Sequence, residues 1–195
     1  QTAMFYIAEA LTRWLAPILS FTAEEIWRYM PGARNESVFF NTWFELPKDL
    51  AQRPSIAWDA ILDLRSAISR ELEKLRVAGS IGAPLDAEVD VYCRPPLLDT
   101  LQSFGEELRF VFITSAARVH AAESRPADAV PAEAGQGNSA NSANSAWIVV
   151  KPTAARKCVR CWHKREDVGH DARHPELCGR CVTNVEGPGE VRRFT

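Results

Sequence analysis

The sequence predicts an α+β protein of three parts, and three observations carry this prediction. Apolar residues recur at helical spacing in the first part of the chain, most clearly from Trp58 to Leu75. Beyond residue 80, short runs alternate apolar and polar side chains, which is typical of strands. The last forty residues contain two Cys-x2-Cys pairs. We therefore expect a helical part over 1–79, a small mixed α/β part over 80–155 and a cysteine-rich module over 156–195.

The helical part should contain three helices. The first begins near Met4 and should bend or end near Pro17, because proline lacks the N–H that a helix interior needs. A second, shorter helix should stop at Pro31 and the glycine that follows it. The third carries the clearest amphipathic stripe of the chain and should end just before Gly79.

The α/β part should begin with a strand around Val89 to Cys93, followed by a helix over 97–108. The apolar run 108–113 predicts a second strand, and 117–121 predicts a third. Residues 122–146 are rich in Ala, Pro, Gly, Asn and Ser, so this stretch is expected to be a flexible insert. Residues 147–150 restore strand character.

The two cysteine pairs are the most specific motif. Cys158 and Cys161 are separated by two residues, as are Cys178 and Cys181, with sixteen residues between the pairs. This spacing is typical of a tetrahedral zinc site, and four protein ligands leave no position for a reactive water, which predicts one structural zinc ion. Two disulfides or four reduced thiols are the alternatives. The fifth cysteine, Cys93, is expected to be a buried small apolar residue.

Composition and charge bound the class of protein. The chain has 195 residues, 46% of them apolar, and a net charge of -2, so it is not a basic nucleic-acid binder overall. Residues 156–195 carry nine Lys or Arg and six Asp or Glu, a mild positive excess that gives weak support to an anionic partner. We expect no membrane association, because no apolar run approaches the length that spans a bilayer.

Several stretches resemble bacterial isoleucyl-tRNA synthetases. The segment 15–27, LAPILSFTAEEIW, is similar to the helical anticodon-binding domain of the class I synthetases for isoleucine, valine and leucine. Residues 65–77 with the following GSIG, then ELRFV at 107–111, resemble the isoleucine enzymes. The tail CVRCWH at 158–163, DVG at 167–169 and CGRCVTNV at 178–185 is similar to their C-terminal zinc module. The resemblance covers nearly all of the chain outside the Asn/Ser/Ala repeat.

The resemblance implies the C-terminal part of a cytoplasmic, monomeric enzyme that attaches isoleucine to its tRNA using ATP. Residues 1–79 would be the end of the anticodon-binding domain, 80–155 a connecting domain and 156–195 a tRNA-contacting zinc module. The His-Ile-Gly-His and Lys-Met-Ser-Lys-Ser motifs of the family's adenylation site are absent from this sequence. The chain by itself is therefore expected to bind no ATP and to be inactive, and to help position the anticodon arm.

Within the module, residues beside the cysteines are the candidates for contact with tRNA. Trp162 and Arg160 could stack on or hydrogen-bond to unpaired bases. The alternatives are that Trp162 packs over the metal site and that Arg160 donates to a cysteine sulfur. The candidates for phosphate contacts are the remaining basic residues Lys157, Lys164, Arg165, Arg180, Arg192 and Arg193.

Two other functions are compatible with two Cys-x2-Cys pairs near the end of a chain. The tail could be the zinc finger of a DNA-repair glycosylase, but those enzymes need an N-terminal proline and an adjacent glutamate, and this sequence opens with Gln1 and Thr2 in a helical pattern. It could also be a non-catalytic zinc ribbon that binds protein. The segment that resembles the anticodon-binding domain argues against both, and we expect no DNA partner.

Overall fold

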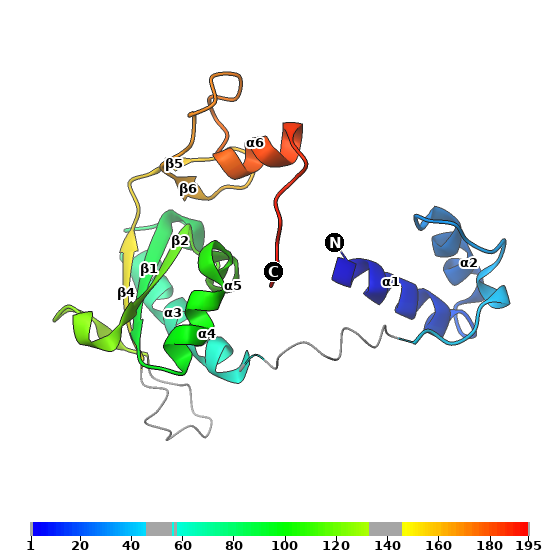
Figure 1. Cartoon of the computed structure of the whole chain (residues 1–195), viewed down its shortest axis with the longest axis horizontal. Coiled ribbons are helices and arrows are strands. Elements are labelled where there is room, and N and C mark those ends of the chain that lie inside the picture. Colours follow the sequence, from blue (N-terminus) through cyan, green and yellow to red (C-terminus); the bar gives the residue numbers. More distant parts are fainter. Residues whose placement is uncertain (1, 46–55, 57, 133–145, 195) are drawn as a thin grey trace. The chain divides into compact units, whose positions relative to one another are not determined.

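The computed structural model describes residues 2–45, 56, 58–132 and 146–194 and divides the chain into two compact units, Gln1–Ser55 and Ile56–Thr195 (Figure 1). The helix Trp58–Val77 belongs to the second unit, although its sequence groups it with the helices before it. The reason is its apolar stripe, which is buried in one core with the sheet.

Over its described residues, 2–45, the first unit has two α-helices followed by a loop that contacts both of them. Helix α1 spans Thr2–Leu15 and ends before Pro17, as the sequence predicts, and helix α2 spans Ser20–Tyr29. A short 3-10 turn, η1, follows at Val38–Phe40. Trp27 is 2% exposed and donates from Nε1 to the carbonyl oxygen of Asn35 at 2.9 Å, which ties the loop to α2.

The second unit is built on a four-stranded mixed sheet of order β2-β1-β4-β3. Strand β1 pairs in parallel with β2 and antiparallel with β4, and β3 pairs antiparallel with β4. The bounds are α3 Trp58–Val77, β1 Ala87–Cys93, α4 Leu97–Ser103, α5 Leu108–Phe112, β2 Ala116–Ala121, β3 Val130–Pro131 and β4 Ala146–Pro152.

Helices α3, α4 and α5 share their core with one face of this sheet. Residues that alternate along the strands, such as Val89, Val91 and Ile148, are buried among apolar side chains of the three helices. Cys93 lies in the same core with no exposed surface, which confirms the prediction for this cysteine, and burial raises the pKa of its thiol to about 11. Helix α3 ends with a C-terminal turn in which Gly79 has φ +72° and Ser80 donates to the Leu75 carbonyl at 2.9 Å.

Two predictions for this part were wrong. The run 108–113 is the helix α5, preceded by a 3-10 turn at Gly105–Glu107. Its apolar residues are consecutive rather than alternating, a pattern that a short buried helix shares with a buried strand. The proposed insert is ordered over 122–132, which hold a 3-10 turn at Ala122–Ser124 and strand β3. Residues 133–145, including the Asn/Ser/Ala repeat, lie outside the described residues.

The other face of the sheet carries a cluster of charged residues around Asp90. Arg118 donates to both carboxylate oxygens of Asp90, at 2.7 and 3.1 Å, and His120 Nε2 lies 2.9 Å from Oδ1. Burial would raise the pKa of Asp90, but the hydrogen bonds from Arg118 and His120 and the charges of Arg118 and Lys151 outweigh it and lower the pKa to about 2.

We expect this cluster to make the second unit sensitive to acid. A carboxyl group with a lowered folded-state pKa stabilises the fold above its ordinary value of 3.8, and this contribution is lost as the pH falls toward about 2. The contribution is about 2 kcal/mol. Asp90→Asn should therefore flatten the fall in unfolding free energy between pH 5 and pH 2 relative to the parent. A parent-like slope in Asp90→Asn would contradict the prediction.

Candidate metal centre

The structure brings the four predicted cysteines into one cluster. Their Sγ atoms all lie within 4.8 Å of one another, and three of the four residues are buried. Cys158 and Cys161 flank the turn between two short paired strands, β5 Arg156–Lys157 and β6 Lys164–Arg165. Cys178 precedes helix α6, Gly179–Glu186, and Cys181 lies in its first turn. A hairpin turn and a helix start therefore each supply two sulfurs.

The spacing of the sulfurs fits a metal ion and excludes disulfides in this structure. Cys161 and Cys178 have their Sγ atoms 3.7 Å apart, and all of the cysteines are free. A disulfide requires about 2.05 Å. Four sulfurs at about 2.3 Å from a tetrahedral Zn²⁺ are about 3.8 Å from one another. The cluster therefore fits one structural zinc ion.

Hydrogen-bond donors around the four cysteines favour the thiolate form of the sulfurs that they contact. The backbone N–H of Cys178 donates to Cys158 Sγ at 3.4 Å, and Arg160 Nη1 lies 3.7 Å from Cys181 Sγ. Burial raises the pKa of Cys158, but the backbone N–H groups of Cys161, Cys178 and Arg160 outweigh it and the pKa is lowered. The contact with Cys161, together with burial, raises the pKa of Cys178.

The module has little else to hold it together. Its buried apolar cluster consists of the cysteines with Val168, against which Leu177 packs. Gly169 adopts φ +86°, and a Cβ at this position would approach the Pro175 carbonyl oxygen to 2.8 Å. A core this small does not stabilise a fold by itself, so the metal site is its principal cross-link.

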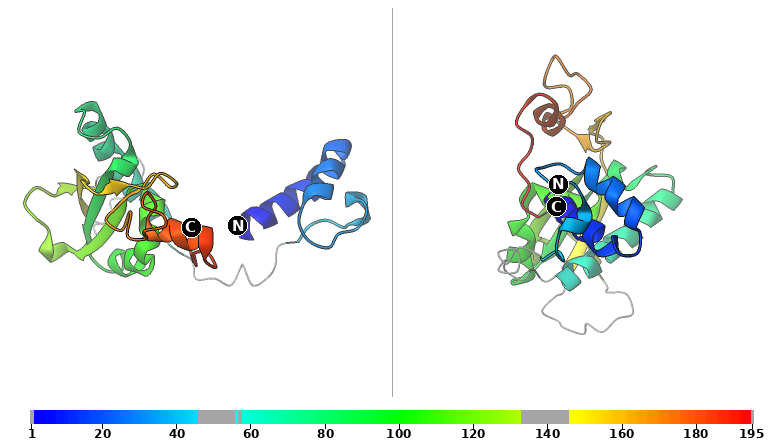
Figure 2. Two further views of the ribbon diagram at one scale, coloured as in Figure 1. Left: turned by 90° about the horizontal axis from the view of Figure 1, so that it is seen from above. Right: turned by 90° about the vertical axis from the view of Figure 1, so that its right-hand side faces the viewer.

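The module is fixed to the α/β part by polar contacts and rings, and in Figures 1 and 2 it lies beyond one end of the four-stranded sheet. Lys164 donates its backbone N–H to Ser115 Oγ at 2.6 Å, and its ammonium group lies 3.3 Å from Asp86. Near the C-terminus, the backbone N–H groups of Arg193 and Phe194 both donate to the Glu107 carboxylate at 2.7 Å.

Comparisons with known proteins match one protein family to each end of the chain. The family described as "Anticodon-binding domain of tRNA ligase" matches residues 1–91, and the family described as "Zinc finger found in FPG and IleRS" matches residues 156–184. The second description names two kinds of protein, so it does not decide between the ligase and other zinc-finger proteins by itself.

Relatives that match over the whole chain decide between the ligase and the other zinc-finger proteins. The chain is 56% identical to the isoleucine–tRNA ligase of Thioalkalivibrio sulfidiphilus and 54% identical to that of Nitrosococcus oceani, each over 100% of its length. It is 52% identical to the enzyme of Halorhodospira halophila over 98% of its length. The chain belongs to the isoleucine–tRNA ligase family. It spans 20% of the length of these relatives.

In the zinc module, Trp162 lies at the surface beside the cysteine cluster. It is 62% exposed, has φ +66°, and is not part of the buried cluster around the sulfurs. Lys157 Nζ lies 5.8 Å from the centre of its ring. The alternative in which Trp162 packs over the metal site therefore does not describe this structure, and one face of the module presents an aromatic ring and a cation together.

Arg160 and four of the phosphate-contact candidates are engaged by other side chains of this chain. Arg160 contacts the sulfur of Cys181, which was its alternative role. The other four pair with carboxylates: Lys164 with Asp86, Arg165 with Glu106, and Arg180 and Arg192 with Glu190. Arg193 contributes its backbone N–H to Glu107. The contacts of Lys164, Arg165 and Arg193 join the module to the α/β part, and those of Arg180 and Arg192 with Glu190 lie within the module. Lys157, by contrast, is exposed beside Trp162.

Sequence reasoning missed Phe110, which joins the module to the α/β part, and its neighbour Arg109. The guanidinium groups of Arg109, Arg180 and Arg192 lie 4.7, 4.9 and 4.3 Å from the centre of the Phe110 ring, and His163 contacts the ring edge-on. Arg109 is 6% exposed, and burial lowers its pKa. The available signal is an arginine inside an apolar run, but a run of this kind also predicts a strand, in which Arg109 would have no such role.

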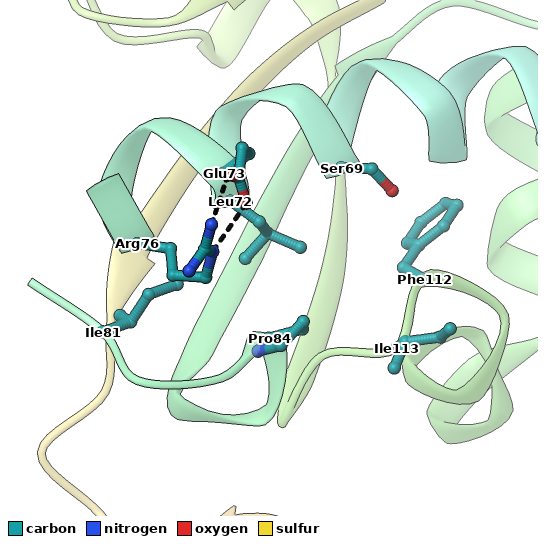
Figure 3. A pocket seen from close by; sticks show the side chains of 8 residues that line it. All are labelled: Ser69, Leu72, Glu73, Arg76, Ile81, Pro84, Phe112 and Ile113. Atoms are coloured by element: carbon teal, nitrogen blue, oxygen red, sulfur yellow. Dashed lines mark hydrogen bonds and ion pairs between the residues drawn. The ribbon is translucent and has the colours of Figure 1, made fainter. Parts of the chain in front are cut away.

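A small apolar pocket lies on the α/β part, between α3, α5 and the segment that leads to β1. Figure 3 shows Leu72, Ile81 and Phe112 directed toward it, with the ion pair between Arg76 and Glu73 on α3. Its volume of about 110 Å³ is below the range of about 300–1,000 Å³ that small-molecule sites occupy. None of the helices in the described ranges combines the length and apolar content needed to cross a membrane.

Proposed function

We propose that this chain is a tRNA-binding part of an isoleucine–tRNA ligase. The whole enzyme would join isoleucine to its tRNA at the expense of ATP, acting as a monomer in the cytoplasm. Adenylation would take place outside this segment, which would hold the anticodon arm and so help to place the acceptor end of the tRNA. Support comes from the matched families and from the whole-chain identity to the ligases.

Zinc would be held by Cys158, Cys161, Cys178 and Cys181 and would act only as a structural cross-link. With all four positions filled by thiolates, the ion has no site for substrate or water. The ion would fix the turn that carries Trp162 relative to helix α6. The observation that carries the proposal for RNA contact is that Trp162 is 62% exposed on this turn, with Lys157 beside it.

Unpaired bases are recognised by stacking on aromatic rings and by hydrogen bonds to their edges. Trp162 supplies a ring, and Lys157 supplies a charge for the adjoining phosphate. Lys164 and Arg165 support this surface indirectly, because their ion pairs with Asp86 and Glu106 hold the module against the α/β part. The proposal therefore places RNA contact on the turn and the docking contacts behind it.

We predict that Trp162→Ala weakens binding of isoleucine-specific tRNA by roughly 1–3 kcal/mol, the value of one aromatic stack on a base. Zinc content should not change, because the indole is not a ligand. The measurement is a tRNA titration of the full-length ligase at a fixed, stated salt concentration. Val159→Ala is the matched control, since Val159 is 54% exposed on the same turn and has no ring. If Trp162→Ala bound the tRNA as tightly as the parent does, the turn would not be part of the RNA contact surface.

A further inference from the structure

Helix α6 begins inside the cysteine cluster, and its start lacks the usual side-chain cap. The first N–H groups of a helix have no partner within the helix, and a Ser, Thr, Asp or Asn at the N-cap position commonly accepts from one of them. In α6 the N-cap residue is Cys178, whose sulfur belongs to the cluster and whose side chain makes no capping hydrogen bond. An acceptor for this helix start therefore comes from another segment or from solvent.

The carboxylate of Asp167 supplies this acceptor. Its Oδ2 accepts a hydrogen bond at 3.1 Å from the backbone N–H of Gly179, the first residue of α6. A negative charge at the N-terminus of a helix is also favoured by the helix dipole. Asp167 follows the hairpin strand β6, so its side chain joins the segment after the first cysteine pair to the helix that carries the second pair.

The backbone that carries this carboxylate is held in place by the residues that follow it. Val168 is buried among the cysteines, and the backbone N–H of Gly169 donates to the carbonyl oxygen of Leu177 at 3.0 Å. Leu177 directly precedes the N-cap residue of α6. Because Asp167 is attached to a fixed stretch of chain, the position of its side chain can determine where the helix begins.

The residue that receives the carboxylate is a glycine, and the close approach explains why. A Cβ at Gly179 would lie 3.0 Å from Asp167 Oδ2, closer than ordinary van der Waals contact. Gly179 does not have a positive φ, so its backbone conformation alone does not require glycine. The hydrogen bond and the missing side chain therefore belong to the same contact.

Only one of the two carboxylate oxygens makes this contact. Oδ1 of Asp167 is buried and has no hydrogen-bond partner among the described residues, and Arg165 Nε lies 3.8 Å from it. The positive charge of Arg165 offsets part of the repulsion between the carboxylate and negatively charged sulfurs nearby. Holding the helix start thus requires the acceptor Oδ2, and no hydrogen bond depends on Oδ1.

We propose that Asp167 is a positioning residue of the zinc site, which holds the start of α6 so that the second cysteine pair lies within bonding distance of the ion held by the first pair. It is not a ligand, because four cysteines already fill a tetrahedral site. Groups that orient metal ligands through hydrogen bonds typically change metal affinity 10- to 100-fold when they are removed. The inference rests on the zinc site of the proposed function and adds a residue beyond the four ligands.

The test measures the zinc affinity of the full-length ligase by competition with a chromogenic chelator. Asp167→Ala removes the acceptor, and we expect it to lower the affinity roughly 10- to 100-fold. Asp167→Asn should retain the parent affinity, because its amide oxygen can accept from Gly179 and its amide nitrogen replaces an oxygen that makes no hydrogen bond. Glu166→Ala is the matched control, since it removes a neighbouring, exposed carboxylate that lies outside the cluster.

Gly179→Ala tests the same contact from the side of the helix. In the parent, the added methyl group should displace the Asp167 carboxylate and lower the zinc affinity. In the Asp167→Ala variant, the same substitution should have no further effect, because the group that it displaces is already gone. Equal losses in the two backgrounds would overturn the proposal, and so would an Asp167→Asn variant as weak as Asp167→Ala.

The role of Asp167 and the zinc site itself can fail separately. If Asp167→Ala bound zinc as tightly as the parent does, Asp167 would have no positioning role, and the zinc site of the proposed function would stand. If the parent ligase contained no zinc after purification without chelators, that site would fail and the role of Asp167 with it.

Discussion

Cys178→Ala will cost the ligase its zinc ion and unfold the module over 156–194, because the site is the main cross-link of this segment. Structural zinc in small modules is worth about 10–16 kcal/mol of apparent binding free energy, and the apolar cluster around Val168 cannot replace that amount. The turn that carries Trp162 would lose its fixed position, so the tRNA binding that we propose for the module would be lost as well.

Elemental analysis, circular dichroism and a tRNA titration at fixed salt measure the three effects. Cys93→Ala is the matched control, since Cys93 is an equally buried thiol in the sheet core and lies outside the cluster. It should retain zinc and tRNA binding. If Cys178→Ala bound tRNA as the parent does, the zinc module would have no part in recognition, although membership of the ligase family would be unaffected.

Phe112→Ala will lower the free energy of unfolding of the second unit by about 3–5 kcal/mol, the usual cost of deleting a buried phenyl ring. Phe112 is 1% exposed and belongs to the core that α3, α4 and α5 share with the sheet. Denaturant titration of the unit's transition measures the change. Phe39→Ala provides the comparison, because Phe39 is 54% exposed and its replacement should cost little.

This substitution also tests the joint between the core and the zinc module. Phe112 anchors α5, and Phe110 lies two residues before it in the same helix. Phe110 contacts His163 and the guanidinium groups of Arg180 and Arg192 in the zinc module. At temperatures where the variant is still folded, zinc content should equal that of the parent, because the cysteine cluster is separate from this core. Loss of zinc from the folded variant would show that the metal site depends on α5.

The sequence by itself determined the features that rest on local spacing. Two Cys-x2-Cys pairs identified the four cysteines that the structure brings together, because two intervening residues allow one turn to direct both sulfurs at one point. The apolar stripe of α3 and the position of Gly79 identified that helix and its end. Segments of the zinc module and of the first helices were similar enough to the ligases to identify the family.

Only the tertiary structure decided what depends on contacts between distant residues. Whether 108–112 forms a helix or a strand depends on packing, since a short apolar run suits either, and α3 joins the sheet because its stripe is buried there. Spacing in the sequence does not reveal that Arg180 pairs with Glu190, nor that Asp167 accepts a hydrogen bond from the start of α6. Local patterns reflect the backbone's own hydrogen bonds and periodicity, whereas charge pairing and cavities are set by side chains that only folding brings together.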